Sequence, residues 1–396
     1  MRIAVVSPFI DRRHGTERAL AELIERLASV YSCEVHLYAQ RVADLVLTPA
    51  GPSGQASRGS ISWHRVPVIP GPQLLRFAAW FVLNRVQRWG RKFDLVLSPG
   101  INCADADVVI VHALFRRLVD LGRAASTEEA HPGFLRQLHR RLYYGLLSAL
   151  ERRVYADPGV ALAAVSRHTA SLLDQYFGRK SVPVVHNGVD TATFSPQACA
   201  ARRERVRAQY QFPSSDFVLL LIGNDWTTKG IRAVFESMLL LPKLSLRLLV
   251  VGSDLREPHV QAATRLGLSE RCTWQPWAAD VLDYYAAADA YVCPSREDSF
   301  SLPVLEAMAC GLPAVTSTAA GACELMTDGV DGFVLQDPAD ANALARILEK
   351  LHQNPSLRQS VGAAAATTAR TCTWDRNAAA AWQILSAAKS SGRRPA

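Results

Sequence analysis

The sequence alternates short apolar runs with longer stretches of helical spacing, and it does so in both halves of the chain. The runs that predict strands are residues 3–6, 35–38, 94–98, 108–111, 161–166, 182–185, 217–222, 246–251, 290–293, 314–316 and 333–335. Continuous apolar strands between helices are typical of parallel sheets that are covered on both faces. We therefore predict an α/β protein with two doubly wound parallel-sheet domains. Ligands of such sheets bind at the carboxyl ends of the strands, here in a cleft between the domains.

Several classes of protein are excluded by composition. No apolar run approaches the about 18 residues of a membrane-spanning helix, and the first residues do not resemble a signal peptide. The eight cysteines form no Cys-x-x-Cys pair and do not cluster with histidines, which argues against a zinc site or a disulfide framework. The chain carries no nucleic-acid-binding motif. We expect a cytoplasmic protein without a metal.

The net charge of +8 arises entirely in residues 1–190, which hold 24 Lys and Arg against 16 Asp and Glu. Such an asymmetry indicates an anionic partner or an arginine-rich solvated surface. Within this half, residues 74–91 interleave leucine, phenylalanine and tryptophan with arginine. This segment is either an amphipathic helix that binds an anionic membrane surface or a buried crossover helix with arginines at its rim.

Two turns that follow predicted strands carry residues suited to an anionic ligand. Gly15 lies where a helix should begin with Thr16 as its N-cap, and a glycine lets a ligand approach the backbone there. Lys229 stands beside Gly230 after residues 217–222, and a lysine at the end of a buried strand can reach a phosphate. A plain strand-to-helix turn and a solvated loop lysine are the alternatives.

The most informative segment is residues 293–313. A polar loop carries Glu297 and Asp298, and a helix should begin near Ser301. The N–H groups at the start of such a helix can bind phosphate, and two carboxylates beside it, Asp298 and Glu306, can accept hydrogen bonds from hydroxyls of ribose and sugar. The alternative for Glu306 is stabilisation of the helix dipole, worth about 0.3–1 kcal/mol.

This segment resembles the signature of the large retaining glycosyltransferase family 4, in which an acidic residue and a glutamate are separated by seven residues. Asp298 and Glu306 take these positions here, with Phe300 between them. Similar motifs occur along nearly the whole chain, at residues 164–166, 186–190, 250–252, 287–289 and 373–374. The turns around Gly15 and Lys229 are similar to those of lipopolysaccharide-core glucosyltransferases.

The resemblance implies a GT-B fold, in which two Rossmann-like domains face a deep cleft. Residues 1–190 would form the acceptor-binding domain and residues 216–371 the nucleotide-sugar-binding domain. Residues 191–215 would connect them, and residues 372–390 would form a terminal helix that crosses back to the first domain.

The resemblance also implies the residues of the donor site. The diphosphate would bind Lys229 and the backbone N–H groups of Phe300, Ser301 and Leu302. Glu306 would hold the ribose, and Asp298, or the adjacent Glu297, the donor sugar.

Three further positions follow from the same comparison. Gly15 would let the first domain approach the diphosphate, and Gly252 would line the donor site. His112 would lie near the donor sugar, unless it is a core histidine. The expected catalytic residues are thus Asp298, His112 and Lys229, with no protein nucleophile assigned.

Three positions depart from the family pattern. Asp298 is one methylene shorter than the usual glutamate, Ser301 replaces a glycine, and Asn224 replaces a basic residue. These departures affect the identity of the donor more than the fold.

The resemblance implies transfer of a sugar from a UDP- or GDP-sugar to a hydroxyl of a saccharide or lipid-linked acceptor, with retention and without a metal or other cofactor. We expect a role in cell-surface polysaccharide or lipopolysaccharide synthesis, at the inner face of the cytoplasmic membrane. The alternatives are a sugar-nucleotide epimerase or hydrolase, and a degenerate member that binds a partner or membrane without transfer.

Overall fold

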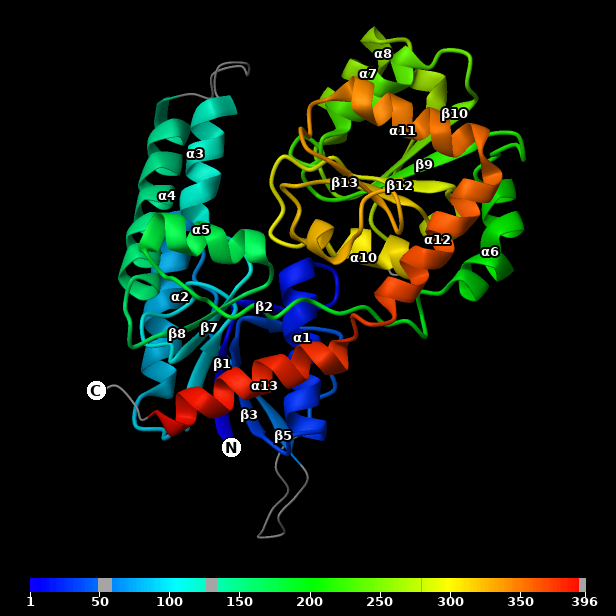
Figure 1. The fold of residues 1–396 in the computed structure, drawn as a ribbon. Coiled ribbons are helices and arrows are strands. Elements are labelled where there is room, and N and C mark those ends of the chain that lie inside the picture. The colour runs from blue at the N-terminus through cyan, green and yellow to red at the C-terminus, as the bar shows by residue number, and fades with distance from the viewer. Residues whose placement is uncertain (49–58, 126–133, 279, 392–396) are drawn as a thin grey trace. The chain divides into compact units, whose positions relative to one another are not determined.

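The chain forms two compact units, each built on its own sheet. The computed structural model describes residues 1–48, 59–125, 134–278 and 280–391 (Figure 1). Unit 1 comprises Met1–His186 and Trp374–Ala396, and unit 2 comprises Asn187–Thr373. Residues 191–215 and their helix therefore belong to unit 2, whereas the last helix belongs to unit 1.

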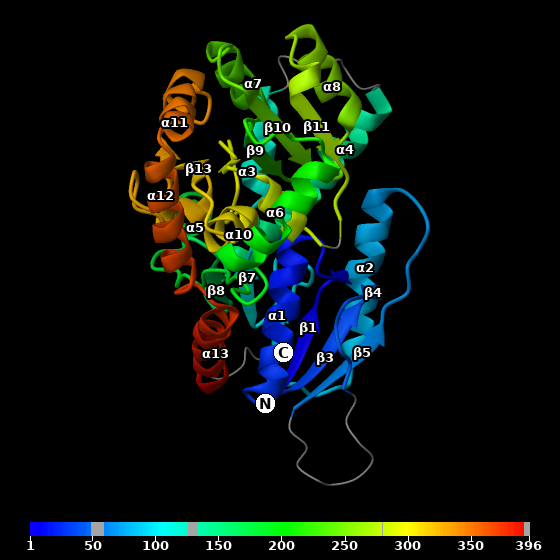
Figure 2. The same cartoon turned by 90° about the vertical axis from the view of Figure 1, so that its right-hand side faces the viewer.

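The sheet of unit 1 has six parallel strands. In spatial order they are β5 (Ser60–Arg65), β3 (Glu34–Ala39), β1 (Arg2–Val6), β6 (Leu95–Ser98), β7 (Val108–Val111) and β8 (Ala161–Ala164). Figure 2 shows β1, β3 and β5 side by side. A small parallel pair joins β2 (Phe9–Ile10) to β4 (Arg41–Val42). The strand predicted at residues 182–185 is wrong, because only a single bridge from Val184 to Ala164 forms there.

Helices cover the sheet of unit 1. They are α1 (Gly15–Ser29), α2 (Gln73–Arg88), α3 (Phe115–Ala125), α4 (Phe134–Tyr155), α5 (Arg167–Phe177) and α13 (Trp374–Ser390). The last helix, α13, packs against α1 and against β6, β7 and β8. Tyr31 and Trp382 stack with their ring centroids 4.6 Å apart, and Arg26 pairs with Asp375 at 2.6 Å. These contacts fasten the carboxyl-terminal helix to unit 1.

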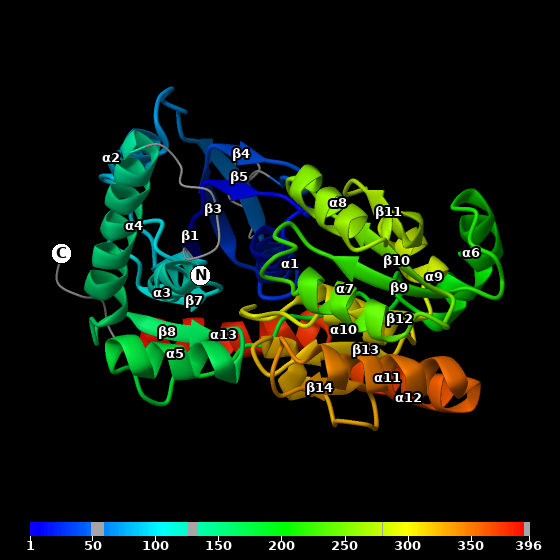
Figure 3. The ribbon, with the colours of Figure 1, turned by 90° about the horizontal axis from the view of Figure 1, so that it is seen from above.

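The sheet of unit 2 also has six parallel strands. In spatial order they are β11 (Cys272–Gln275), β10 (Leu246–Val251), β9 (Phe217–Ile222), β12 (Ala290–Val292), β13 (Ala314–Ser317) and β14 (Phe333–Leu335). The helices are α6 (Pro196–Gln209), α7 (Ile231–Leu240), α8 (Arg256–Arg265), α9 (Leu282–Ala287), α10 (Leu302–Ala309), α11 (Ala341–Gln353) and α12 (Pro355–Ala369), with short 3-10 turns at Ser269–Arg271 and Gly321–Leu325. Figure 3 shows α11 and α12 as neighbours.

Both sheets have the same permuted order. Numbered along the chain within each sheet, the strands lie in the order 3-2-1-4-5-6, which is that of doubly wound dinucleotide-binding folds. The order reverses between the first and the fourth strand, and ligands bind outside the carboxyl ends of the strands at that point. In unit 2 this switch point lies between β9 and β12. The topology alone therefore directs attention to the turns that follow these two strands.

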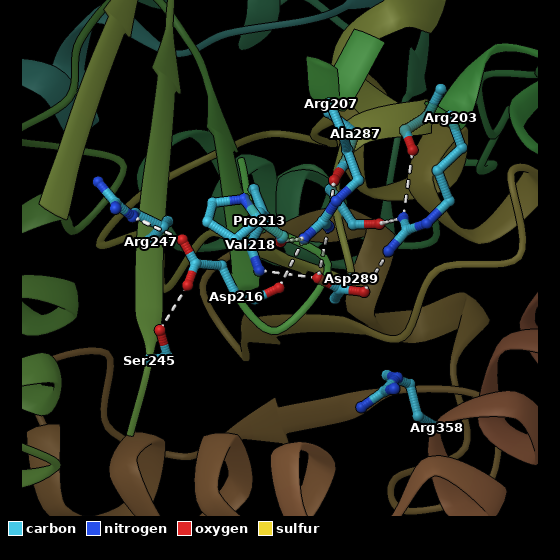
Figure 4. A network of polar contacts seen from close by, with 12 residues as sticks. Arg203, Arg207, Pro213, Asp216, Val218, Ser245, Arg247, Ala287, Asp289 and Arg358 are labelled. Carbon is cyan, nitrogen blue, oxygen red and sulfur yellow. Dashed lines mark hydrogen bonds and ion pairs between the residues drawn. The ribbon is translucent and has the colours of Figure 1, made fainter. Parts of the chain in front are cut away.

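A buried polar network closes the opposite, amino-terminal end of the unit 2 sheet (Figure 4). Asp289, just before β12, accepts hydrogen bonds from Arg203 at 2.6 Å, from Arg207 at 3.1 Å and from the backbone N–H of Val218 at 2.8 Å. Arg207 also donates to the carbonyl oxygens of Ala287, Pro213 and Asp216. Because both arginines lie on α6, the network fixes this helix to the sheet. It lies at the end away from the switch point and serves the fold.

Candidate functional site

The carboxyl ends of β9 and β12 bring together the turn of Lys229 and the loop of Asp298. The backbone N–H of Arg296 donates to the carbonyl of Thr228 at 2.8 Å and joins the two segments. The loop is also held by the segment that follows β13, because Asp298 pairs with Ala320 in a single parallel bridge. Residues 69 positions apart in the sequence thus meet at the switch point.

The turn that carries Lys229 is anchored on both sides. Asp254 accepts a hydrogen bond from the backbone N–H of Trp226 at 2.8 Å, and the Trp226 ring is buried against Trp274 with centroids 5.2 Å apart. Gly230 has a φ of +82°, and a Cβ there would lie 2.1 Å from the Pro294 carbonyl oxygen. Only glycine can occupy that position without moving the turn.

Lys229 and Asp298 form an ion pair. Their side chains are 17% and 14% exposed, so the pair is largely withdrawn from solvent. Burial acts against the charged ammonium, but the Asp298 carboxylate outweighs it, and the pKa of Lys229 is raised. The lysine is therefore a fixed positive charge at neutral pH, held by the carboxylate expected to contact the donor sugar.

The start of α10 is strained and rich in unused donors. Ser301, its N-cap, has a φ of +73°, and its side chain does not cap the helix. Its buried Oγ has no hydrogen-bond partner. Within the part of the chain that the structure describes, the backbone N–H groups of Ser301 and Leu302 also make no hydrogen bond, whereas that of Phe300 donates to Asp298 Oδ1 at 3.2 Å. Such a helix end attracts an anion.

Glu306 lies on α10 and is 4% exposed. The Tyr285 hydroxyl donates to its Oε2 at 2.6 Å. Tyr285 is fully buried on α9, and its ring packs edge-on against Phe194 at 5.7 Å. Burial, followed by the Glu306 charge, raises the pKa of Tyr285 well above its usual value. The phenol stays protonated and orients the carboxylate, which leaves Glu306 as an acceptor for hydroxyl groups.

Two other predicted positions lie at or beside this site in unit 2. A Cβ on Gly252, whose φ is +151°, would lie 1.8 Å from the Gly223 carbonyl oxygen. The glycine thus lets the ends of β9 and β10 approach each other. Glu297 is 8% exposed in the loop beside Asp298. Asn224 accepts a hydrogen bond from the Ser253 N–H at 3.0 Å and so links the same two strand ends.

The remaining two predicted residues lie in unit 1. Gly15 is the first residue of α1, and His14 is its N-cap, so the prediction of Thr16 as N-cap is wrong. Just before the helix, Asp11 accepts hydrogen bonds from the N–H groups of Arg13 and His14. His112 follows β7 and is partly buried. Desolvation lowers its pKa to about 4, so the imidazole is neutral at pH 7.

Among the described residues, no group of three or more His, Cys, Asp or Glu side chains could hold a metal ion. In the same residues, no helix is long and apolar enough to span a membrane.

Sequence reasoning missed the residues that position the site. Tyr285 orients Glu306, while Asp254 and Trp226 hold the turn of Lys229. Asp254 follows β10 and Tyr285 lies on α9, and nothing in their local sequence indicates which side chain they reach. Of these three residues, only Trp226 could have been noticed in the sequence, because it is a tryptophan within a polar turn.

Both units of the chain match models of known protein families. The family model described as "Glycosyl transferases group 1" matches residues 202–368, and that of "Glycosyltransferase Family 4" matches residues 13–193. Together the two models span most of the chain.

One curated relative is the D-inositol 3-phosphate glycosyltransferase of Streptomyces scabiei. It is 32% identical over 229 residues, which are 54% of this chain and 50% of the relative. The chain thus matches about half the length of this relative.

Solved structures show the same fold. WaaG, a glycosyltransferase involved in lipopolysaccharide biosynthesis, superposes with a TM-score of 0.77 and 20% identity over 97% of this chain and 99% of WaaG. HepE of Anabaena, in complex with UDP and glucose, gives a TM-score of 0.70 and 19% identity over 98% of this chain and 100% of HepE. The chain has the GT-B fold and belongs to glycosyltransferase family 4.

Proposed function

We propose that this glycosyltransferase transfers a sugar from a UDP- or GDP-sugar to a hydroxyl group, with retention of the anomeric configuration and without a metal. One observation carries the proposal. A buried lysine, a carboxylate and the open amino-terminal end of α10 lie together at the switch point of the unit 2 sheet. This is the combination that a diphosphate joined to a sugar requires.

Lys229 and the start of α10 supply the electrostatic part of the mechanism. When the bond between the anomeric carbon and the diphosphate oxygen breaks, negative charge develops on the diphosphate. The Lys229 ammonium and the N–H groups of Ser301 and Leu302 would stabilise this charge, and they are already in position. The acceptor oxygen attacks the anomeric carbon, and the acceptor proton passes to an oxygen of the departing phosphate.

The two carboxylates supply recognition of the neutral parts of the donor. A carboxylate only accepts hydrogen bonds, so it suits hydroxyl groups and disfavours phosphate. We assign Glu306, oriented by Tyr285, to the ribose hydroxyls, and Asp298 to those of the donor sugar. We also assign Glu297, Phe300 and Gly252 to the donor site.

Gly15 and His112 of unit 1 are retained in the proposal as donor contacts. A neutral imidazole can donate one hydrogen bond and accept another, and the lowered pKa of His112 keeps it in that form. His112→Ala should therefore lower kcat more than it raises KM for the donor. If His112→Ala lowers the melting temperature and leaves kcat unchanged, His112 is a core residue and not a donor contact.

The names of related proteins support the class of substrate. HepE of Anabaena was solved with UDP-glucose, the Streptomyces relative is named for D-inositol 3-phosphate, and WaaG for lipopolysaccharide biosynthesis. We therefore propose a saccharide or lipid-linked acceptor, and a role in the synthesis of a cell-surface polysaccharide or lipopolysaccharide.

The test is calorimetric titration of the full chain with UDP-, GDP-, ADP-, dTDP- and CMP-sugars. One UDP- or GDP-sugar should bind, and Lys229→Ala and Glu306→Ala should each weaken binding by about tenfold or more, because each removes a charged hydrogen-bond partner worth about 1.5–3 kcal/mol. Lys243→Ala, which removes a lysine outside the site, should bind like the wild type. Absence of binding to every donor would refute the proposal.

We also propose that unit 1 binds an anionic membrane surface through α2. Four exposed apolar side chains, Leu75, Val82, Val86 and Trp89, are spaced seven, four and three residues apart. At about 100° per residue, they form one stripe along the helix and its end. Trp89 is 85% exposed. Of the predicted amphipathic residues, Trp80 and Arg88 are instead buried.

Basic side chains near this apolar stripe favour an anionic membrane as its partner. Arg76, Arg85, Arg91 and Lys92 are exposed on or just after α2, and each basic residue near an anionic bilayer contributes about 1 kcal/mol. The chain should therefore sediment with vesicles containing phosphatidylglycerol, and less so in high salt or with Trp89→Ser. Equal binding to neutral vesicles, or none to anionic ones, would refute this part of the proposal.

A further inference from the structure

Lys229, the residue assigned to the diphosphate, has an anionic partner in this structure. Asp298 uses its two carboxylate oxygens differently. Oδ2 contacts the Lys229 ammonium, and Oδ1 accepts the backbone N–H of Phe300 at 3.2 Å. The backbone of Asp298 is fixed as well, because its N–H donates to Ala319 and its carbonyl accepts from Gly321, both at 2.9 Å. The carboxylate is therefore held in place beside the lysine.

A diphosphate that approaches Lys229 must come close to this fixed carboxylate. Both groups are anionic, and both require the same ammonium. The pair is largely shielded from solvent, so water and salt screen the repulsion less than they would on the surface. Binding of a diphosphate at Lys229 thus requires the lysine to be shared with Asp298 or withdrawn from it.

We propose that Asp298 competes with the diphosphate for Lys229 and thereby makes the site discriminate a nucleotide sugar from the free nucleoside diphosphate. The inference rests on the proposed function. A donor sugar brings hydroxyl groups that can donate hydrogen bonds to the carboxylate, which compensates Asp298 for the loss of Lys229. A nucleoside diphosphate brings no such hydroxyls to Asp298, so its binding leaves a largely buried carboxylate uncompensated.

This competition has a consequence for turnover. After transfer, the sugar and its hydroxyls leave with the acceptor, and the diphosphate remains beside an uncompensated carboxylate. Asp298 then regains Lys229 as the diphosphate departs. The residue assigned to the donor sugar therefore also favours release of the product.

The test is Asp298→Asn, studied by calorimetric titration of the full chain with UDP and GDP. The amide is isosteric, and its oxygen can still accept the Phe300 N–H, so the loop should keep its conformation; thermal unfolding checks this. UDP or GDP should bind the variant about tenfold more tightly than the wild type, since Lys229 is no longer paired with Asp298 and is free for the diphosphate. Glu257→Gln, which removes an exposed carboxylate of α8 outside the site, should change the affinity less than twofold.

A double-mutant cycle shows whether the effect acts through the lysine. In a Lys229→Ala background, Asp298→Asn should leave the weakened affinity for UDP or GDP almost unchanged. Unchanged or weaker binding by Asp298→Asn alone would overturn the inference, as would an equal gain from Glu257→Gln or a gain that persists without Lys229. If no UDP- or GDP-sugar binds the wild type, the proposed function fails and the inference with it. Binding that Lys229→Ala weakens and Asp298→Asn does not tighten would overturn the inference alone.

Discussion

The hydrogen bond from Tyr285 to Glu306 allows the sharpest test of how the site is held. Tyr285→Phe removes only the hydroxyl, and the ring keeps its contacts with Phe194 and Tyr291. The bond is short, at 2.6 Å, and both of its partners are buried. A hydrogen bond to a charged group is worth about 1.5–3 kcal/mol. We expect the free energy of unfolding to fall by about that amount.

The assay combines stability with donor kinetics. For a unit of this size, the loss corresponds to a melting temperature lower by about 3–12 °C. Because the phenol orients the carboxylate assigned to ribose, the variant should raise KM for the donor and change kcat little. Tyr291→Phe is the matched control, since its buried hydroxyl interacts with the Ile222 carbonyl at 3.4 Å and with Cys293, and not by a hydrogen bond with Glu306. Equal effects of the two variants, or none from Tyr285→Phe, would refute the reasoning.

Three further predictions concern stability. Ser301→Gly should raise the melting temperature by about 2–4 °C, because it relieves a left-handed backbone and removes an unpartnered buried hydroxyl. Ser181 is also left-handed but exposed, so Ser181→Gly should raise the melting temperature less. A melting temperature of Ser301→Gly below that of the wild type would contradict the strain. Burial raises the pKa of Glu151 to about 7, against 4.5 ordinarily. Between these pH values the folded state binds more protons than the unfolded state, so the free energy of unfolding should decrease as pH rises from about 4.5 to about 7. Urea unfolding at several pH values should show a smaller decrease for Glu151→Gln than for the wild type. An equal decrease in the two proteins would refute the raised pKa. Arg207→Leu should lower the free energy of unfolding by about 3–5 kcal/mol, because it removes a partner of the Asp289 carboxylate. Arg205→Leu removes an exposed ion pair with Asp283 and should lower it by less than about 1 kcal/mol. Similar losses for the two variants in urea unfolding would contradict the role of the network.

The sequence predicted the central strands well and missed one edge strand of each sheet. Strands β9 and β10 are covered on both faces and appear as nearly unbroken apolar runs. Strands β5 and β11, which were missed, are the first strands of their sheets in spatial order. Their burial is partial and their sequences, SISWHR and CTWQ, are mixed. The other two edge strands, β8 and β14, were predicted because their runs are apolar and largely buried.

For the candidate site, sequence supplied the reactive groups but not their support. The spacing of Asp298 and Glu306 and the turn of Lys229 were sufficient to make these three residues candidates. Their contacts with Tyr285 and Asp254 depend on how helices and strand ends pack together, which no local pattern contains. The ion pair between Lys229 and Asp298 also became visible only in the structure, and it changes the expected role of both residues.

The most direct measurement is the crystal structure of the full chain with the UDP- or GDP-sugar that binds it. The diphosphate should lie within hydrogen-bonding distance of Lys229 Nζ and of the N–H groups of Ser301 and Leu302. The ribose hydroxyls should contact Glu306 and the sugar hydroxyls Asp298. A donor bound away from the start of α10, with Lys229 still paired to Asp298, would contradict the central claim.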